Sequence, residues 1–280
     1  MQMRLVDLIK ERSGPLVFPE AIDPLSARLV EQRGYPGIYT GGHGVSALYH
    51  GIPDFGLVES GELAAVAERI ASSVSVPVLF DADQGGETLL NMRRNVRRFE
   101  CTGVAAIHLE DTTNPKHLGL GVIGLDEWKR RVATACEARV GDSLAIVARS
   151  DYLYFLPKRE RSQALDVVIE RGRAVAEAGA DLFWPVFLAV DDIDLVGREV
   201  GIPLVDYNQP VGAVATTSLA IDVIPTYSAF RYLGAAAATL DELERDGRVD
   251  FRTSGLPLDQ FEGLQDVPGY ETELKKMTGA

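Results

Sequence analysis

Acidic side chains directly follow two successive apolar segments of the chain, and they are the residues best placed to do chemistry. Asp81 and Asp83 come after one apolar run, and Glu110 comes after the next. Carboxylates that converge repel one another unless a cation lies between them. Mg²⁺ prefers such hard oxygen ligands and keeps several waters in its shell. We therefore predict that Asp81, Asp83 and Glu110 bind Mg²⁺ directly or through water, with Mn²⁺ as the alternative ion.

Each of these acids has a simpler interpretation as a cap of the helix that follows, because helix N-termini favour carboxylates. The presence of Arg149 after the next apolar run favours one shared site over separate caps. Arg149 has five donors in a fixed plane and suits a bidentate contact with a substrate carboxylate. A structural ion pair is its alternative. Asp111 stays open between a metal ligand and a cap of the following loop.

Several other polar residues could complete a binding site. The glycine-rich run GGHG at 41–44 would let the backbone approach a ligand and direct N–H groups at an anionic oxygen. Tyr207 and Asn208 could supply a hydroxyl and an amide from a later segment. No G-x-G-x-x-G motif opens a helix after the first apolar run, which argues against a nicotinamide cofactor.

Two residues of one loop are candidates for proton and charge chemistry. Histidine is a common proton donor in enzymes, so His117 could donate a proton, with a solvated loop residue as the alternative. Lys116 could neutralise charge on a substrate when the loop closes. His108 lies within an apolar segment, so we expect it to be packed in the interior.

The elements that must position these residues are eight short apolar segments that alternate with helix-period segments. Apolar strands without polar alternation are typical of a parallel sheet covered on both faces. Strands that alternate with helices predict βαβ units, and eight of them favour a (β/α)8 TIM barrel over an open doubly wound sheet. Barrel active sites lie at the C-terminal ends of strands, where the acids stand. The predicted strands are Leu16–Phe18, Gly37–Thr40, Val76–Phe80, Ala105–Leu109, Leu144–Ala148, Leu182–Trp184, Pro203–Val205 and Val223–Ile224.

The C-terminal part of the chain predicts additional helical structure. Ala229–Arg245 reads as a long helix rich in alanine. No linker rich in Pro, Gly or Ser divides the chain, so we expect a single barrel domain over 1–280, with 251–280 as a C-terminal extension. Such an extension is a plausible oligomer contact.

Composition narrows the classes of partner. With 280 residues, 46% of them hydrophobic, the chain can bury a large core. Its net charge of −13 argues against nucleic acid and anionic membranes, although a local pocket can still bind a small anion. Apolar runs are too short to span a bilayer, and the first residues lack a signal-peptide core. Two widely spaced cysteines predict a cytoplasmic protein.

Four segments of the chain resemble the isocitrate lyase/phosphoenolpyruvate mutase superfamily over about Leu16 to Asp181. They read PEAIDPLSARLVEQRGYPGIYTGGHGVSALYHGIPDFGL, VPVLFDADQGG, GVAAIHLEDTTNPK and AIVARSDYL. The resemblance implies a (β/α)8 barrel and a tetramer, a dimer of dimers, in which a C-terminal helix is swapped between copies. It also implies an enolate-type intermediate and places residues in three roles. These are Mg²⁺ binding by Asp81, Asp83 and Glu110, carboxylate binding by Arg149 and the backbone of Gly41, Gly42 and His43, and proximity to the substrate for Tyr39 and Asp54.

The departures from that family are informative. Its lyases carry a mobile loop Lys-(Lys/Arg)-Cys-Gly-His whose cysteine is the general acid, whereas this chain keeps Lys116 and has Leu118 at the cysteine position. Val186 stands where the family's lyases have glutamate and its phosphonomutases have histidine. These features resemble the oxaloacetate decarboxylase branch, yet residues 225–228 lack the histidine expected there.

The sequence therefore predicts a Mg²⁺-dependent lyase that acts on a small anionic 2-oxo acid. It would cleave or form a C–C bond next to the carbonyl, by decarboxylation or an aldol-type step. Arg149, Lys116, His117 and Asp54 are its candidate catalytic residues. One alternative is a phosphonopyruvate-type P–C mutase or hydrolase, and another is a non-catalytic barrel that binds a 2-oxo acid.

Overall fold

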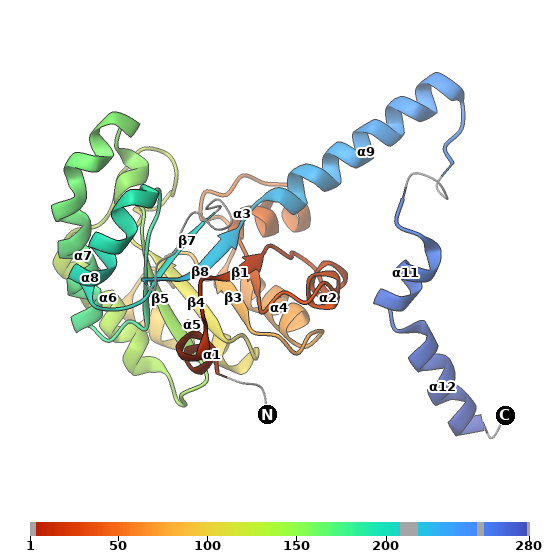
Figure 1. Ribbon diagram of the computed structural model, residues 1–280, viewed down its shortest axis with the longest axis horizontal. Helices are drawn as coiled ribbons and strands as arrows, with labels where there is room; N and C mark the ends of the chain where they lie inside the picture. Colours follow the sequence, from red (N-terminus) through yellow and green to blue (C-terminus); the bar gives the residue numbers. More distant parts are fainter. Residues whose placement is uncertain (1–3, 208–217, 251–254, 279–280) are drawn as a thin grey trace. The chain divides into compact units, whose positions relative to one another are not determined.

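Eight parallel strands form one sheet at the centre of the fold (Figure 1). The computed structural model describes residues 4–207, 218–250 and 255–278. The strands lie in the spatial order β1-β8-β7-β6-β5-β4-β3-β2, so each pairs with its sequence neighbour except at the seam. They are β1 (Leu16–Pro19), β2 (Ile38–Thr40), β3 (Val78–Asp81), β4 (Ala106–Glu110), β5 (Ala145–Ser150), β6 (Leu182–Pro185), β7 (Leu204–Tyr207) and β8 (Leu219–Ile224).

The sheet closes on itself. β1 pairs with β8 in parallel, and a single parallel bridge between Glu20 and Tyr39 joins the ends of β1 and β2. The N–H of Ala21 also donates to the carbonyl of Tyr39 at 2.8 Å. These contacts confirm the predicted barrel and exclude the open doubly wound sheet, in which the two edge strands would not meet.

Helices follow the strands and cover the outside of the barrel, with α6, α7 and α8 on one side of Figure 1 and α2 and α4 on the other. The α-helices are α1 (Leu5–Glu11), α2 (Pro24–Gln32), α3 (Gly42–Val45), α4 (Ser60–Ala71), α5 (Leu89–Cys101), α6 (Leu125–Ala138), α7 (Leu165–Glu177), α8 (Ile193–Val200), α9 (Tyr227–Asp246), α11 (Leu258–Leu264) and α12 (Val267–Thr278). Short π and 3₁₀ turns are η1 (Ser46–His50), η2 (Tyr152–Phe155), η3 (Lys158–Ala164) and η4 (Val190–Asp192).

Helical spacing of small and apolar residues explains how the outer layer packs. In α7 the buried residues Val168, Gly172 and Val175 recur every three or four positions and so face the sheet. Gly172 is needed there because a side chain would overlap Val200 and Phe183. Among the described residues, no helix combines the length and apolarity that a membrane crossing requires.

A second apolar cluster fills the inside of the barrel. Phe18, Leu79, Val147 and Ile221 belong to it, as do side chains of the other strands. Leu5 and Ile9 of α1 also belong to this cluster, which places α1 over the amino-terminal end of the barrel. The opposite, carboxyl-terminal end is therefore left for polar side chains.

The chain divides into two compact units, Met1–Tyr227 and Ser228–Ala280. The first contains the barrel. The second contains nearly all of α9, together with α11 and α12, so the predicted helix at Ala229–Arg245 is present and is slightly longer than expected.

The strand ends differ from the sequence prediction most at β8. It begins at Leu219, four residues before the predicted Val223. Asp222 interrupts the apolar run, and its burial inside a strand could not be foreseen from its charge. Asn208, a predicted substrate contact, lies outside the described residues.

Gly37 provides a test of how tightly β2 approaches β1. A Cβ atom at this position would overlap the ring of Phe18, which is fully buried. We expect Gly37→Ala to lower the free energy of unfolding by about 1–3 kcal/mol, the usual cost of overpacking. Urea unfolding followed by circular dichroism measures this. Gly14→Ala, which meets nothing within 4 Å, is the control, and equal stability of both variants would contradict the packing described.

Candidate active site

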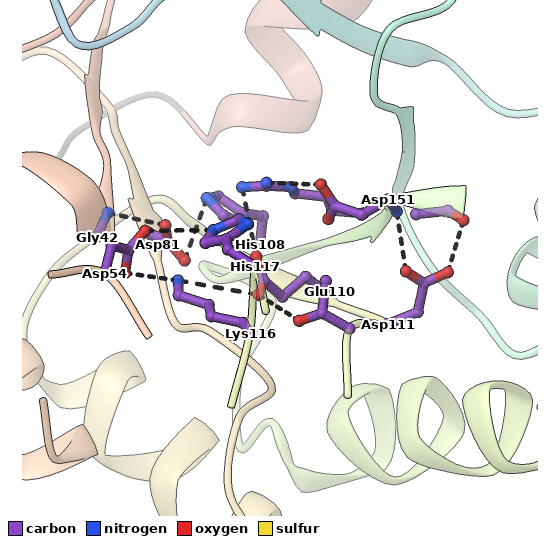
Figure 2. Close-up of polar contacts among 12 residues, drawn as sticks. Gly42, Asp54, Asp81, His108, Glu110, Asp111, Lys116, His117 and Asp151 are labelled. Atoms are coloured by element: carbon purple, nitrogen blue, oxygen red, sulfur yellow. Dashed lines mark hydrogen bonds and ion pairs between the residues drawn. The ribbon is translucent and has the colours of Figure 1, made fainter. Parts of the chain in front are cut away.

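Strand register brings the predicted acids and the arginine to one level of the barrel. Asp81 ends β3 opposite His108 of β4, and Glu110 ends β4 opposite Arg149 of β5. Parallel strands direct their carboxyl ends to the same rim. Figure 2 shows Asp81, Glu110 and His108 close together there, with Lys116 and Asp54 reaching in from loops.

The ammonium group of Lys116 lies among three carboxylates. Its Nζ contacts Asp83, lies 2.9 Å from Asp54 Oδ1, and is 3.8 Å from Glu110 Oε1. Burial disfavours the charged amine, but the surrounding carboxylates outweigh it and raise the pKa of Lys116 well above its ordinary value. The loop lysine is thus a permanent positive charge inside an acidic rim.

Two carboxylates face the space left by a glycine. The N–H of Gly42 donates to Asp81 Oδ2 at 2.8 Å, and the N–H of Asp83 donates to Asp81 Oδ1 at 2.9 Å. A Cβ on Gly42 would lie 2.9 Å from Asp81 Oδ2 and 3.3 Å from Asp83 Oδ1. Asp83 itself has a φ of 51°, an unusual conformation for a non-glycine residue that turns the chain directly after β3.

Glu110 is oriented by two neutral polar side chains. Its Oε1 accepts hydrogen bonds from Gln84 Nε2 at 3.0 Å and from Thr112 Oγ1 at 2.5 Å. Its Oε2 is buried without a hydrogen bond and lies 3.4 Å from Arg149 Nη1. One oxygen is therefore fixed, while the other retains capacity to bind a cation.

The acidic rim suits a hard divalent ion that keeps part of its water shell. Burial and the neighbouring carboxylates raise the pKa of Asp83 to about 7 even though Lys116 acts in the opposite direction, so the rim is short of positive charge. Within the described residues, no three acidic, histidine or cysteine side chains close around one point. Asp83 and Glu110 instead both lie near Lys116 Nζ, and Asp81 accepts the N–H of Asp83. Mg²⁺ accepts incomplete protein ligation, since it keeps several waters.

The guanidinium of Arg149 has a hydrogen-bond partner at Nη2 and none at Nε. Its Nη2 donates to Asp151 Oδ1 at 2.8 Å, and its Cζ lies 5.4 Å from the centre of the Trp184 ring. Its Nε is buried without a hydrogen-bond partner. A buried, unsatisfied donor is costly, and an anionic ligand would remove that cost. The sequence left a structural ion pair and a ligand contact as alternatives, and the structure contains the ion pairs.

Asp111 belongs to a buried structural network. Ser150 Oγ and the N–H of Asp151 donate to it at 2.6 and 2.9 Å. Arg171, which comes from α7, donates to Asp111 Oδ2 through Nη2 at 2.6 Å and through Nε at 3.0 Å. Every Asp111 oxygen is thus engaged within the protein, away from Lys116 and Asp83.

His108 is packed in the interior as predicted, yet it touches the site. Its Nε2 lies 3.5 Å from Asp81 Oδ1 and 3.4 Å from the hydroxyl of Tyr39. Burial lowers the pKa of His108 to about 4, so the ring is neutral at physiological pH. It therefore positions Asp81 and Tyr39 without adding charge.

His117 and Asp54 meet at the mouth of the site. The Nε2 of His117 lies 3.5 Å from Asp54 Oδ2, and its ring makes an edge contact with Tyr154 at 5.4 Å between centroids. The structure thus brings together the four predicted catalytic residues: Lys116 joins Asp54, and Arg149 lies beside Glu110.

The remaining predicted substrate contacts surround this centre. Gly41 precedes α3, and the side chain of His43 is exposed. Tyr207, at the end of β7, lies 6.3 Å from Trp184 between ring centroids. Sequence reasoning missed the roles of Gln84, Thr112, Arg171 and Trp184. Gln84 and Thr112 stand in the segments that resemble the family, yet the resemblance gave neither of them a role. Only the short spacing of Thr112 from Glu110 offered a signal.

These features define a (β/α)8-barrel enzyme whose acidic rim holds a lysine and an arginine. Residues 5–236 match the model of the phosphoenolpyruvate phosphomutase family. The chain belongs to this family, which confirms the resemblance to the isocitrate lyase/phosphoenolpyruvate mutase superfamily.

Three similar proteins illustrate the range of the family. An oxaloacetate decarboxylase from Pseudomonas fluorescens is 31% identical over 254 residues, 88% of this chain and 85% of that protein. A 2,3-dimethylmalate lyase from Eubacterium barkeri is 35% identical over 173 residues, 60% of this chain but only 57% of the relative's length. The solved phosphoenolpyruvate phosphomutase from Streptomyces platensis subsp. rosaceus has a TM-score of 0.87 at 25% identity and 98% coverage of both chains.

The buried pair of Asp111 and Arg171 gives a stability prediction. We expect Arg171→Met to lower the free energy of unfolding by about 3–5 kcal/mol, because it leaves a buried carboxylate without its cation. Arg173→Met is a matched control on the same helix, since its pair with Glu199 is exposed and worth about 1 kcal/mol or less. Denaturant unfolding measures the stability of both variants. Similar losses would show that the buried pair contributes no more to stability than the exposed one.

Proposed function

We propose that this protein is a Mg²⁺-dependent lyase that cleaves, or in reverse forms, a C–C bond next to the carbonyl of a small 2-oxo acid. The observation that carries the proposal is the position of Asp83 and Glu110 around Lys116, with Asp81 bonded to the N–H of Asp83. The unpartnered Nε of Arg149 lies next to this group, since Arg149 contacts Glu110. A site with cation-binding oxygens and an open arginine donor suits an anionic substrate with adjacent carbonyl and carboxylate groups. Relatives described as an oxaloacetate decarboxylase and a 2,3-dimethylmalate lyase support this class.

Substrate binding in this proposal begins at Arg149. Its guanidinium is fixed by Asp151 and Trp184, so the free Nε can meet a carboxylate without a further loss of side-chain freedom. Tyr39 lies beside His108 at the inner wall. Gly41, Gly42 and His43 would contribute backbone near the same carboxylate, while Tyr207 and Asn208 would approach from β7.

Asp81, Asp83 and Glu110 would hold Mg²⁺, or Mn²⁺ in its place. When bound, the ion would polarise the substrate carbonyl and offset the negative charge that develops during bond cleavage. Lys116 adds a second, fixed positive charge at the same rim. Because the site is buried, each of these charges acts more strongly than it would in water.

Proton delivery is where this chain departs from its lyase relatives. Cleavage leaves an electron pair on the carbon next to the carbonyl, and that carbon must accept a proton. His117 lies beside Asp54 at the mouth of the site and is the proposed donor. Burial raises the pKa of Tyr207, so its hydroxyl stays protonated and is the alternative donor. The buried Val186 and the exposed Leu118 cannot transfer protons, which fits a reaction that needs no base to deprotonate an alcohol.

Metal dependence and substrate class can be tested together. Oxaloacetate, 2-methylisocitrate and phosphonopyruvate are assayed with Mg²⁺, with EDTA, and with Mg²⁺ restored. We expect turnover of a carboxylic substrate that EDTA abolishes and Mg²⁺ restores. Asp83→Ala should lower kcat/KM by about 100-fold or more, the scale of losing a metal-site residue. The exposed Asp142→Ala is the control.

The other outcomes of that assay separate the alternatives. Turnover of phosphonopyruvate alone would favour P–C chemistry, for which the family description is the main support. Binding of oxalate without turnover of any substrate would favour a non-catalytic barrel. Activity that survives both EDTA and Asp83→Ala would remove the metal from the proposal.

We further propose a cytoplasmic homotetramer, a dimer of dimers, in which the unit Ser228–Ala280 is exchanged between copies. In α12 the exposed side chains Tyr270, Leu274 and Met277 recur at helical spacing and form an apolar stripe. Stripes of this kind usually pack against another surface. Both cysteines are free thiols, which suits a reducing compartment.

The apolar stripe of α12 can be tested by placing a charge in it. We expect the wild-type protein to elute with four times the mass of one chain in size exclusion with light scattering. Leu274→Glu should shift it to smaller species, because a charge in an apolar contact is costly. Glu273→Gln, the adjacent position, should leave the mass unchanged. A wild-type monomer would refute the assembly.

A further inference from the structure

A continuous row of aromatic rings runs along the rim from Arg149 to His117. Trp184 lies under Arg149, and the ring of Tyr207 follows at 6.3 Å between centroids. Phe187 lies 5.4 Å from Tyr207 and stacks on Tyr154 at 5.9 Å. We call Trp184, Tyr207, Phe187 and Tyr154 the aromatic wall. It draws on the loops or ends of β5, β6 and β7, so it borders the same rim as the acidic site.

A second arginine lies on this wall. The Cζ of Arg161, from η3, is 4.4 Å from the centre of the Phe187 ring. Its Nε makes one long hydrogen bond of 3.4 Å to the carbonyl of Leu156. Over the part of the chain that the structure describes, no carboxylate forms an ion pair with Arg161. Phe187 presents its ring from a backbone with a φ of 68°, a conformation that costs energy for a bulky residue.

Tyr207 lies between the two arginines. Burial raises the pKa of its hydroxyl, and Arg149 and Arg161 both act in the opposite direction. The ring contacts run from Arg149 through Trp184 to Tyr207 and from Tyr207 through Phe187 to Arg161, which places Arg161 on the aromatic wall.

Arg161 differs from the other arginines near the site in its ion pairs. Arg149 is paired with Asp151 and Glu110, and Arg171 is paired with Asp111. The chain has 41 acidic and 28 basic residues, so acids are in excess. Stacking on an aromatic ring leaves the edge of a guanidinium free for an anion. Arg161 is half-buried, and no described carboxylate pairs with it although the chain has an excess of acids. Its guanidinium is therefore suited to bind an anionic group of a ligand.

We propose that Arg161, with Phe187 and Tyr207, forms a distal subsite for a second anionic group of the substrate. This inference rests on the proposed function, in which Arg149 holds the carboxylate next to the carbonyl. It specifies the substrate class: 2-oxo acids with a second anionic group, separated from the first by a segment that lies along the aromatic wall.

The subsite also bears on the reaction type. A carboxylate that leaves as carbon dioxide gives up its charge, so a cation beside it stabilises the ground state more than the transition state. A group held by Arg161 is therefore one that the substrate retains. Retro-aldol cleavage keeps the second anionic group, whereas decarboxylation at that group does not. The distal subsite thus argues against loss of the carboxylate that Arg161 holds, and it is consistent with cleavage at any bond that leaves this group on the product.

Matched ligands can isolate the contribution of Arg161. Binding is measured by calorimetry with Mg²⁺ for 2-oxoglutarate against 2-oxopentanoate, and for 2-oxoadipate against 2-oxohexanoate. Each pair has the same chain length and differs in the second carboxylate. We expect the wild type to prefer the diacid roughly ten-fold or more in at least one pair, the scale of a charge-assisted contact. Oxalate, which is too short to span both arginines, reports on the Arg149 end alone.

Arg161→Met should abolish the preference for the diacid and leave oxalate affinity unchanged. Arg159→Met is the matched control, since Arg159 lies in the same segment with a side chain that is 85% exposed. It should retain the preference. Phe187→Leu should weaken the preference by removing the ring beneath the guanidinium.

Different results would refute the distal subsite and the proposed function. If oxalate binds but the wild type does not distinguish the ligands of either pair, or if Arg161→Met keeps the distinction, the distal subsite is wrong and the proposed function stands. If oxalate does not bind and no 2-oxo acid is turned over, the proposed function fails, and the subsite that rests on it fails too.

Discussion

Repulsion among buried carboxylates at the carboxyl end of the barrel is the constraint on which the site depends. Parallel register places Asp81 and Glu110 on adjacent strands, and the turn at Asp83 adds a third acid. Such a group is stable only when positive charge lies within it. Lys116 and Arg149 supply part of that charge from a loop and from β5. The remaining deficit is what makes this end of the barrel suited to a divalent cation and an anionic ligand.

Much of the fold and of the central site could be predicted because strong local signals carried them. Apolar strands that alternate with amphipathic helices indicated the barrel, and the acids stood directly after those strands. Lys116, His117 and Asp54 meet in the structure although Asp54 and Lys116 are 62 positions apart in the sequence. That contact was accessible only through resemblance to a family, since spacing along the chain does not indicate which loops fold over the same rim.

The rest depended on contacts that no sequence pattern encodes. Nothing in the sequence indicates that the charged side chain of Arg171 is buried, yet it enters the interior and pairs with Asp111. The start of β8 was predicted too late because Asp222 lies within the strand, and a charged residue normally marks the end of an apolar segment. The aromatic wall is assembled from the ends of β6 and β7 and from the segments that follow β5 and β6. The chain position of Phe187 or Tyr154 gives no sign that their rings stack. Such features arise from tertiary packing, which overrides local propensity.

The tie from α7 to Asp111 has a consequence for how this site can diverge. Asp111 follows Glu110 in the chain and accepts the N–H of Asp151, the partner of Arg149. The guanidinium of Arg171 thereby holds the Asp111 carboxylate and the backbone carbonyl of Ile123 in place from the outer layer. The loops that bear His117 and Phe187 lie outside this network of hydrogen bonds, so they can change while the end of the barrel keeps its shape. The residues that fix the shape of this end of the barrel are thus anchored by Arg171 of α7, a side chain that lies outside the pocket.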